Sequence, residues 1–252
     1  PFTRRISWTE PLRRAGLLGS ESNVSRFMPA YRTVHASDEL TLVRAVAVGG
    51  CSLVTCGNLV RAETGLRDIG LDLSPEFDEL ERLIGVSTVP EERWRPLTRE
   101  MFAAAQEMDL GPRPTPKAVD MKKCISCGLC EAGCPTGARW DARRSLNEAV
   151  RAGCAVQTGS VVRKVLIENG KAAGVEVSRA DGNETVRGDA VVLAAGGLGT
   201  AQVLRASGIE PSDTLWADLV LTIGGRSKGA RQLEEPPMAW YAQRDGYIIS
   251  PY

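Results

Sequence analysis

Four of the seven cysteines in this chain lie within one short run, and no other sequence feature constrains the fold as strongly. The run consists of Cys124, Cys127, Cys130 and Cys134. Thiols this close together in a chain of 252 residues indicate a metal centre in a reducing compartment, since a disulfide framework spreads its cysteines along the chain. Each of the other three is predicted to be a small apolar filler and not a reactive thiol: Cys51, Cys56 and Cys154.

The spacing C-x₂-C-x₂-C-x₃-C-P is the one that bacterial-type ferredoxins use to bind an iron–sulfur cluster. Two-residue gaps let a tight loop direct successive thiolates at neighbouring iron atoms. Gly128 and Gly133 are predicted to form the sharp turns of the loop, and Pro135 to end it. A structural zinc site is the alternative, but zinc ligands commonly come in two separated pairs. The sequence therefore predicts a single [4Fe-4S] cluster.

The fourth ligand of this cluster has more than one candidate. In ferredoxins with two clusters, the last cysteine of such a run serves the other cluster. This chain has no second run, so Cys134 either completes its own cluster or is replaced by one of the three remaining cysteines.

Charge and hydropathy argue against several classes of partner. The formal net charge is zero, so nothing favours nucleic acid or an anionic membrane. No apolar run approaches the ~20 residues that a membrane-spanning helix needs. The first residues, PFTRRISWTEPLRRAG, lack the apolar core of a secretory signal, so we expect a cytoplasmic protein.

Turn residues and apolar periodicity predict a mixed α/β chain. A buried strand is expected over Leu42–Val48, and an extended linker over 112–120. Helices are predicted after Pro75, from Thr98 as N-cap to Gly111, over 140–153 and over 198–208. Asn169-Gly170 and Asp181-Gly182 indicate hairpins between short strands: Ala155–Thr158, Val161–Ile167, Ala172–Val177 and Thr185–Val186. Asp189–Ala195 is predicted to be a strand inside a parallel sheet, and the tail from Leu215 to be antiparallel.

Two glycine-rich segments surround the cysteine run: AVGGCSLVTCGN and VVLAAGGLGTAQVL. Either one alone is typical of a tight turn after a buried strand. Together, in this order and with GCPTGAR and AVQTGSVVRKV between them, they resemble the glucose–methanol–choline (GMC) family of FAD-dependent oxidoreductases. The resemblance covers the chain from about Thr33 onward.

The resemblance implies a set of FAD contacts, in which small residues let backbone N–H groups approach the cofactor. Cys51 differs from the hydroxyl residue usual in the family. The implied contacts are Gly49, Gly50, Ser52, Asn58, Val162, Ala195 and Gly196.

The same resemblance bears on the cluster. Some bacterial GMC dehydrogenases carry a [3Fe-4S] cluster at this place, and their ligands have the spacing of Cys124, Cys130 and Cys134. Cys127 would add a fourth ligand. We therefore favour one [4Fe-4S] cluster that is bound by all four cysteines, with a [3Fe-4S] cluster as the alternative.

The implied fold is a Rossmann-like FAD-binding domain in discontinuous segments, with a smaller α+β region and a ferredoxin-like cysteine loop. We expect the FAD-binding domain at 1–65 and 139–214, a substrate or cap region at 66–120 and 215–252, and the iron–sulfur loop at 121–138. The family's opening G-x-G-x-x-G strand and its C-terminal catalytic segment are not found in this sequence, so we expect a portion of a longer or split enzyme. The single histidine, His35, precedes the glycine loop and is expected to be structural, which leaves the catalytic base unassigned.

The resemblance implies a flavin-dependent dehydrogenase that takes a hydride from an alcohol-type small molecule. Single electrons would leave through the cluster to a partner protein or subunit, or flow in the opposite direction. One alternative is a non-catalytic electron-transfer subunit of a larger redox complex. Another is a redox-inert cluster that only stabilises the loop.

Overall fold

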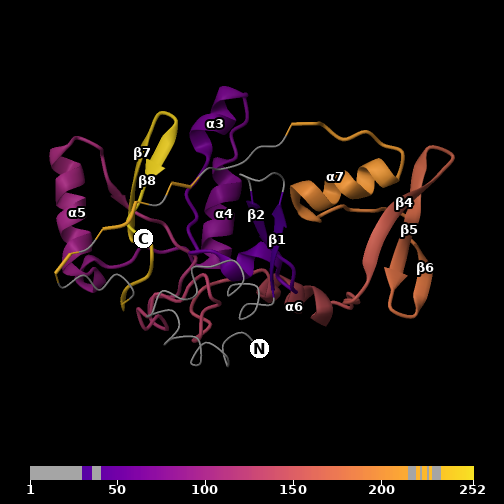
Figure 1. Ribbon diagram of the computed structural model, residues 1–252, viewed down its shortest axis with the longest axis horizontal. Coiled ribbons are helices and arrows are strands. Elements are labelled where there is room, and N and C mark those ends of the chain that lie inside the picture. The colour runs from indigo at the N-terminus through magenta and orange to yellow at the C-terminus, as the bar shows by residue number, and fades with distance from the viewer. Residues whose placement is uncertain (1–29, 36–40, 215–219, 222, 226, 229–233) are drawn as a thin grey trace. The chain divides into compact units, whose positions relative to one another are not determined.

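The computed structural model describes residues 30–35, 41–214, 220–221, 223–225, 227–228 and 234–252 (Figure 1). The chain divides into two units, which we describe separately. Unit 1 comprises Pro1–Ala152 and Gly225–Tyr252, and unit 2 comprises Gly153–Gly224. The start of the predicted FAD-binding domain and part of the predicted cap region lie outside the described residues, and the predicted domain boundaries remain a prediction.

Unit 1 combines helices with short antiparallel sheets. Its strands are β1 (Tyr31–His35), β2 (Thr41–Ala45), β3 (Arg113–Pro114), β7 (Trp240–Arg244) and β8 (Tyr247–Ile249). Its helices are η2 (Gly50–Val54), α3 (Glu63–Asp68), α4 (Ser74–Ile84), η3 (Glu91–Arg93), α5 (Pro96–Glu107) and α6 (Arg143–Arg151). One sheet pairs β1 with β2, and another has the order β3-β7-β8.

The segment 112–120 is extended, as predicted, but it is not a free linker. Residues 115 and 117–119 are buried, because other parts of unit 1 pair with the segment along its length. β3 pairs with β7, and the Lys117 N–H donates to the Ser87 carbonyl over 2.7 Å. Further along, the Ala118 N–H donates to the Gly57 carbonyl over 2.7 Å. This segment therefore connects the C-terminal strands to the glycine loop.

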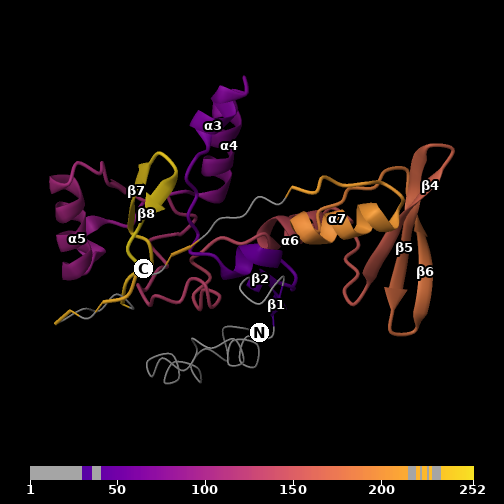
Figure 2. The ribbon, with the colours of Figure 1, turned by 45° about the horizontal axis from the view of Figure 1, so that its top comes forward.

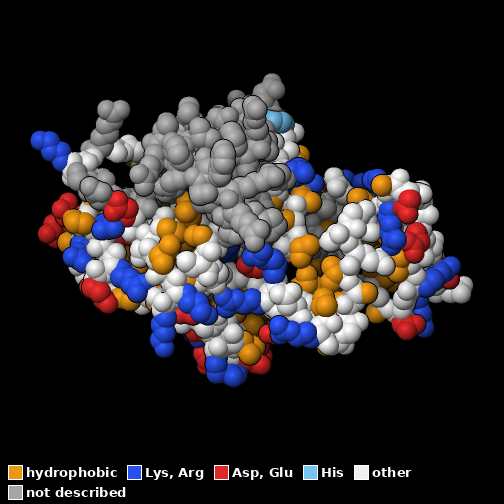
Figure 3. All heavy atoms as spheres, turned by 90° about the horizontal axis from the view of Figure 1, so that it is seen from below, with side chains coloured by type: hydrophobic (Ala, Val, Ile, Leu, Met, Phe, Trp, Pro, Cys, Tyr) orange, Lys and Arg blue, Asp and Glu red, His pale blue; other side chains and the backbone are white. Residues whose placement is uncertain are grey.

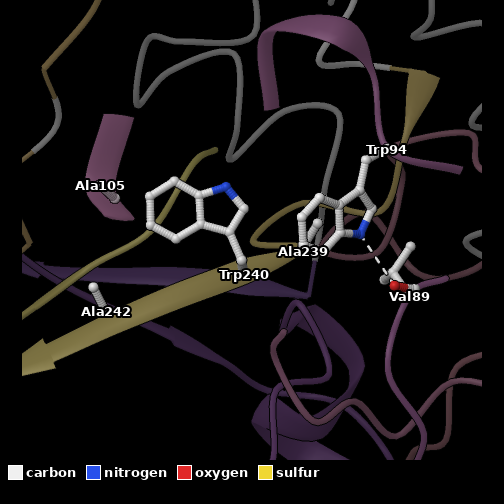
Figure 4. Packing of buried hydrophobic residues seen from close by; sticks show 6 residues of the cluster. All are labelled: Val89, Trp94, Ala105, Ala239, Trp240 and Ala242. Atoms are coloured by element: carbon white, nitrogen blue, oxygen red, sulfur yellow. Dashed lines mark hydrogen bonds between the residues drawn. The ribbon is translucent and has the colours of Figure 1, made fainter. Parts of the chain in front are cut away.

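Aromatic side chains form the core of unit 1 (Figure 4). Phe102 of α5 lies between two tryptophans, with ring centroids 5.1 Å from Trp94 and 5.8 Å from Trp240, both in edge-to-face geometry. Each indole N–H has a carbonyl partner, Val89 for Trp94 and Thr98 for Trp240. Burying aromatic area while satisfying its polar atoms is a strongly stabilising arrangement.

The helices confirm some predicted boundaries and correct others. Pro75 lies in the first turn of α4, where its missing N–H costs nothing. In α5, however, the predicted N-cap Thr98 is already inside the helix, which begins at Pro96. The reason is that the Glu235 carboxylate accepts hydrogen bonds from the Arg95 N–H and the Thr98 hydroxyl, so a distant residue caps this end.

The predicted buried strand Leu42–Val48 is also corrected. The strand β2 ends at Ala45 and pairs only with β1, in a two-stranded ribbon that leaves Val43 59% exposed. Among the described residues of this region there is no second layer to cover it. The expected glycine turn follows, with Gly49 at φ 101° and Gly50 at φ 55°.

Unit 2 is a three-stranded antiparallel meander with one helix (Figures 1 and 2). It contains β4 (Val161–Glu168), β5 (Lys171–Arg179), β6 (Gly182–Arg187) and α7 (Gly196–Ala206). Asn169 and Gly170 form the first turn with positive φ, as predicted, while Gly182 already belongs to β6. α7 lies alongside β4, and the Val165 N–H donates to the Ser207 hydroxyl over 2.8 Å.

Two strands predicted in unit 2 are wrong. Ala155–Thr158 and Asp189–Ala195 are not strands, and Val192 is 88% exposed. A strand needs a hydrogen-bonded neighbour, and no described residue of this unit pairs with either segment. All strand pairs found in the described part of the chain are antiparallel, so the expected parallel sheet is not seen there.

Surface properties match the composition. Acidic and basic side chains are interspersed on the face shown in Figure 3, in keeping with the zero formal charge. Within the described ranges, no helix has both the length and the apolar character required to cross a bilayer.

Candidate functional site

The cysteine run forms an irregular loop in unit 1 whose turns depend on positive φ angles. Gly128 has φ 65° and Gly133 has φ 87°, which confirms the turns predicted at these two glycines. Ser126 also has a positive φ, 53°, a backbone conformation that residues other than glycine rarely adopt. The backbone therefore turns sharply at several points within the run.

The thiols of this loop are partly withdrawn from water and affect one another electrostatically. Cys130 is buried, and burial is the main reason that its pKa is raised to about 12. Lys117 lowers it, whereas the charges on Cys134 and Cys124 raise it further. The pKa of Cys127 is likewise raised, mainly by burial, with contributions from the same two thiols. Cys127 and Cys130 are thus both affected by the charges of Cys124 and Cys134.

Backbone N–H groups point at two of the sulfur atoms. The Ser126 N–H donates to Cys124 Sγ over 3.4 Å, and the Arg139 N–H donates to Cys134 Sγ over 3.5 Å. Burial raises the pKa of Cys134, but hydrogen bonds from the Thr136 hydroxyl and from the backbone N–H groups of residues 136, 138 and 139 outweigh it, so the pKa is lowered. N–H···S bonds that stabilise a thiolate are also the bonds that tune an iron–sulfur cluster.

Thiolates are the ligands that iron–sulfur clusters prefer, so the residue types of this loop suit the predicted cofactor. Among the residues that the structure describes, no three His, Cys, Asp or Glu side chains are grouped closely enough to hold a metal ion. The ligand roles of the four cysteines therefore remain a prediction.

The other cysteines differ from one another. Cys56 is buried, as predicted for a filler, and its thiol donates to Glu131 Oε1 over 3.3 Å. Cys51 and Cys154 are exposed, so the prediction of buried filler is wrong for both. Cys51 lies in the first turn of η2, and its sulfur accepts a hydrogen bond from the Ala45 N–H over 3.4 Å.

The glycine loop, residues 49–58, lies in the same unit as the cysteines. The Ser52 hydroxyl donates to the Gly49 carbonyl over 2.5 Å and accepts from the Ala142 N–H over 2.9 Å. A Cβ atom at Gly49 would lie 3.0 Å from the Arg143 side chain, so this position is closely packed. Ser52 thus holds the loop against the start of α6, and its predicted contact with FAD remains a prediction.

A residue that the sequence analysis missed, Arg139, joins the glycine loop to the cysteine loop. Its side chain is 2% exposed, and its guanidinium donates to the carbonyls of Ser52 and Leu53, the latter over 2.8 Å. Its backbone N–H is the donor to Cys134. One residue therefore fixes two candidate cofactor loops, and its position five residues after Cys134 is the only sequence signal of this role.

A second missed residue is Lys117 on the buried extended segment. Its ammonium donates to the Cys56 carbonyl over 3.1 Å and to Asn58 Oδ1 over 2.5 Å. Burial lowers its pKa, while Cys130 and the other nearby thiols act in the opposite direction. Asn58, a predicted FAD contact, is thus oriented by a buried cation.

The remaining predicted FAD contacts belong to unit 2. Val162 lies on β4 and pairs with Val177 of β5. Ala195 is the N-cap residue of α7, and Gly196 begins the helix with φ 73°. A helix N-terminus presents free N–H groups, which suit an anionic group of a cofactor.

The thiol pKa values predict a pH-dependent order of alkylation in the cluster-free, reduced protein. Only the thiolate reacts with iodoacetamide, so the lowered pKa of Cys134 makes it react at a lower pH than Cys130. Peptide mass spectrometry after short pulses at rising pH, starting from about pH 7, measures both sites in one sample. Equal labelling of the two cysteines throughout the series would contradict the assigned environments.

Arg139→Met should loosen the glycine loop. Hydrogen bonds from a charged donor contribute about 1.5–3 kcal/mol each, so amides of residues 50–57 should exchange at least about tenfold faster. Hydrogen exchange measured by mass spectrometry tests this. Arg144→Met is the control, because the exposed Arg144 donates to the Gly137 carbonyl only. A folded Arg139→Met protein with unchanged exchange in this loop would refute the role.

Comparison with known proteins places the chain in a family. Residues 13–225 match the GMC oxidoreductase family. A GMC-type oxidoreductase of Mycobacterium tuberculosis is 30% identical over 216 residues, which is 79% of this chain and 34% of that protein. The C-glycoside 3-oxidase of Arthrobacter globiformis is 31% identical over 197 residues, 72% of this chain and 36% of that enzyme. The chain thus spans about a third of the length of the curated relatives it matches.

A solved structure supports the same fold. Pyridoxine 4-oxidase from Mesorbium loti matches 71% of this chain and 41% of its own, with a TM-score of 0.53 and 20% sequence identity. Since the family match covers most of the sequence, the chain belongs to the GMC oxidoreductase family, whose membership implies an α/β FAD-binding fold and FAD as the cofactor.

Proposed function

We propose that this chain is part of an FAD-dependent dehydrogenase that also carries one [4Fe-4S] cluster. The observation that supports it best is the connection through Arg139, which holds the glycine loop by its side chain and Cys134 by its backbone N–H. In a GMC oxidoreductase, a glycine loop suits FAD, and a cysteine loop joined to it offers thiolates for an iron–sulfur cluster. When bound, FAD supplies two-electron chemistry, and a cluster supplies one-electron transfer.

The residues of this chain have distinct roles in the proposal. Gly49 and Gly50 let the backbone approach FAD, and Ser52 and Asn58 complete that loop in unit 1. Val162, Ala195 and Gly196 supply backbone contacts from unit 2. The four loop cysteines ligate the iron, with N–H···S bonds supporting Cys124 and Cys134.

The proposed reaction is removal of a hydride from an alcohol-type small molecule. A one-electron outlet distinguishes a dehydrogenase from an oxidase that reduces oxygen directly, so we propose a partner protein or subunit as the electron acceptor. The proposed location is the cytoplasm, where thiols stay reduced.

Cys127→Ser tests the ligand set in the anaerobically reconstituted full-length protein. With four cysteine ligands, the wild type should contain about four iron atoms per chain, and the variant about three, with the EPR spectrum of a three-iron cluster. Iron, sulfide and flavin are quantified on the same samples. Cys154→Ser is the matched control, since Cys154 is exposed and lies outside the loop, and should keep the wild-type content.

Three outcomes would revise the proposal. About three iron atoms in both the wild type and Cys127→Ser would exclude Cys127 as a ligand and favour the [3Fe-4S] alternative. A cluster without flavin would favour an electron-transfer subunit. Zinc in place of iron would overturn the proposed cluster.

A further inference from the structure

Two arginines face each other directly across the β1–β2 ribbon, and we call them the arginine pair. In the antiparallel register of these strands, Arg32 lies opposite Arg44. Residues in such positions have Cβ atoms about 4.5–5.5 Å apart, and like charges there destabilise the pairing of the strands. The ribbon therefore holds two positive charges together at a cost in stability that the fold alone does not explain.

Arg44 has no partner for its guanidinium among the described residues. Its Nε is buried without a hydrogen bond, and none of its other nitrogens forms a hydrogen bond or an ion pair in the part of the chain that the structure describes. The buried Nε of Arg139 and of Arg179 also lacks a partner, but both of these arginines donate from other nitrogens. Arg32 donates to the neighbouring Tyr31 carbonyl over 2.9 Å. A buried donor without an acceptor is costly, so the Arg44 guanidinium is suited to a ligand that supplies one.

The arginine pair lies where the ribbon runs into the glycine loop. The Val46 N–H donates to the Ala30 carbonyl over 2.7 Å, which fixes this end of the ribbon. The Ala45 N–H donates to Cys51 Sγ over 3.4 Å. Arg44 is therefore one residue away from a direct contact with the loop in which we place FAD.

We propose that the arginine pair binds a phosphate group at the base of the glycine loop. A guanidinium presents five N–H donors in a fixed plane, and two of them match two oxygens of one phosphate. An anion held between the two side chains gives the Arg44 Nε an acceptor. It also replaces the repulsion between two like charges with the attraction of both to one shared partner.

Two kinds of ligand carry such a group. One is FAD, whose diphosphate joins the two halves of the molecule, and in this case the inference rests on the proposed function. The other is a separate small molecule that bears a phosphate. The position of the pair at the glycine loop favours FAD, and because the arginines use the same chemistry for both, the experiment has to separate them.

Inorganic pyrophosphate is the first probe, measured by calorimetry on the full-length protein in flavin-free and FAD-loaded forms. Arg44→Met keeps an unbranched side chain and removes the guanidinium, so it should weaken pyrophosphate binding to the flavin-free protein at least about tenfold. Arg44→Lys restores the charge without the Nε donor and should recover only part of the affinity. Arg82→Met is the matched control, because Arg82 is an exposed residue of α4 and its loss changes the net charge equally.

FAD and riboflavin, which has no phosphate, identify the source of the group. If the diphosphate of FAD occupies the pair, Arg44→Met weakens FAD binding at least about tenfold and leaves riboflavin binding unchanged. The FAD-loaded wild type then binds no pyrophosphate. If a separate ligand occupies the pair, Arg44→Met keeps its affinity for FAD, and the FAD-loaded wild type still binds pyrophosphate.

The stability of the flavin-free protein distinguishes a ligand site from a structural role. Since Arg44 combines an unpartnered Nε with a like-charge neighbour, Arg44→Met should melt at the same temperature as the wild type or higher. A lower melting temperature, no pyrophosphate binding in the flavin-free wild type, or an equal loss of affinity in Arg82→Met would overturn the inference. A wild type that binds no flavin would overturn the proposed function, while the pyrophosphate comparison would still decide this inference.

Discussion

The rest of unit 1 depends on the backbone pairing of one extended segment, residues 112–120. A buried extended chain must find partners for its N–H and carbonyl groups, and here those partners come from four separate places. They are the C-terminal strand β7, Ser87, the glycine loop, and the stretch after the last cysteine, where the Asp120 N–H donates to the Ala138 carbonyl over 2.9 Å. The segment therefore brings the two candidate cofactor loops together.

Two buried cations strengthen this arrangement in different ways. Arg139 satisfies carbonyls of the glycine loop with its planar, multi-donor group, which is the geometry that Arg offers and Lys does not. Lys117 instead donates from a compact ammonium to the Cys56 carbonyl and to Asn58 Oδ1. A further anchor is Glu131, whose carbonyl accepts from the Tyr31 hydroxyl over 3.1 Å and whose carboxylate accepts from Cys56.

Local chemistry could be predicted from the sequence, and distant partners could not. The turns at Gly128 and Gly133 and at Asn169-Gly170 need positive φ, so the residue type alone indicates them. The cap of α5 was not predicted because Glu235 lies far along the chain from that helix. The burial of Lys117 and Arg139 was not predicted because lysine and arginine are usually at the surface. Asp189–Ala195 has the composition of a strand, but a strand also requires a neighbour.

We propose that one loop of four cysteines holds a single iron–sulfur cluster in this member of the GMC oxidoreductase family. Native mass spectrometry of the anaerobically purified full-length protein tests it most directly, because it weighs every bound group at once. We expect a mass increase equal to one FAD plus about four iron and about four sulfide atoms, with about three iron atoms for the [3Fe-4S] alternative. A mass increase of FAD alone, or of FAD with one zinc ion, would contradict it.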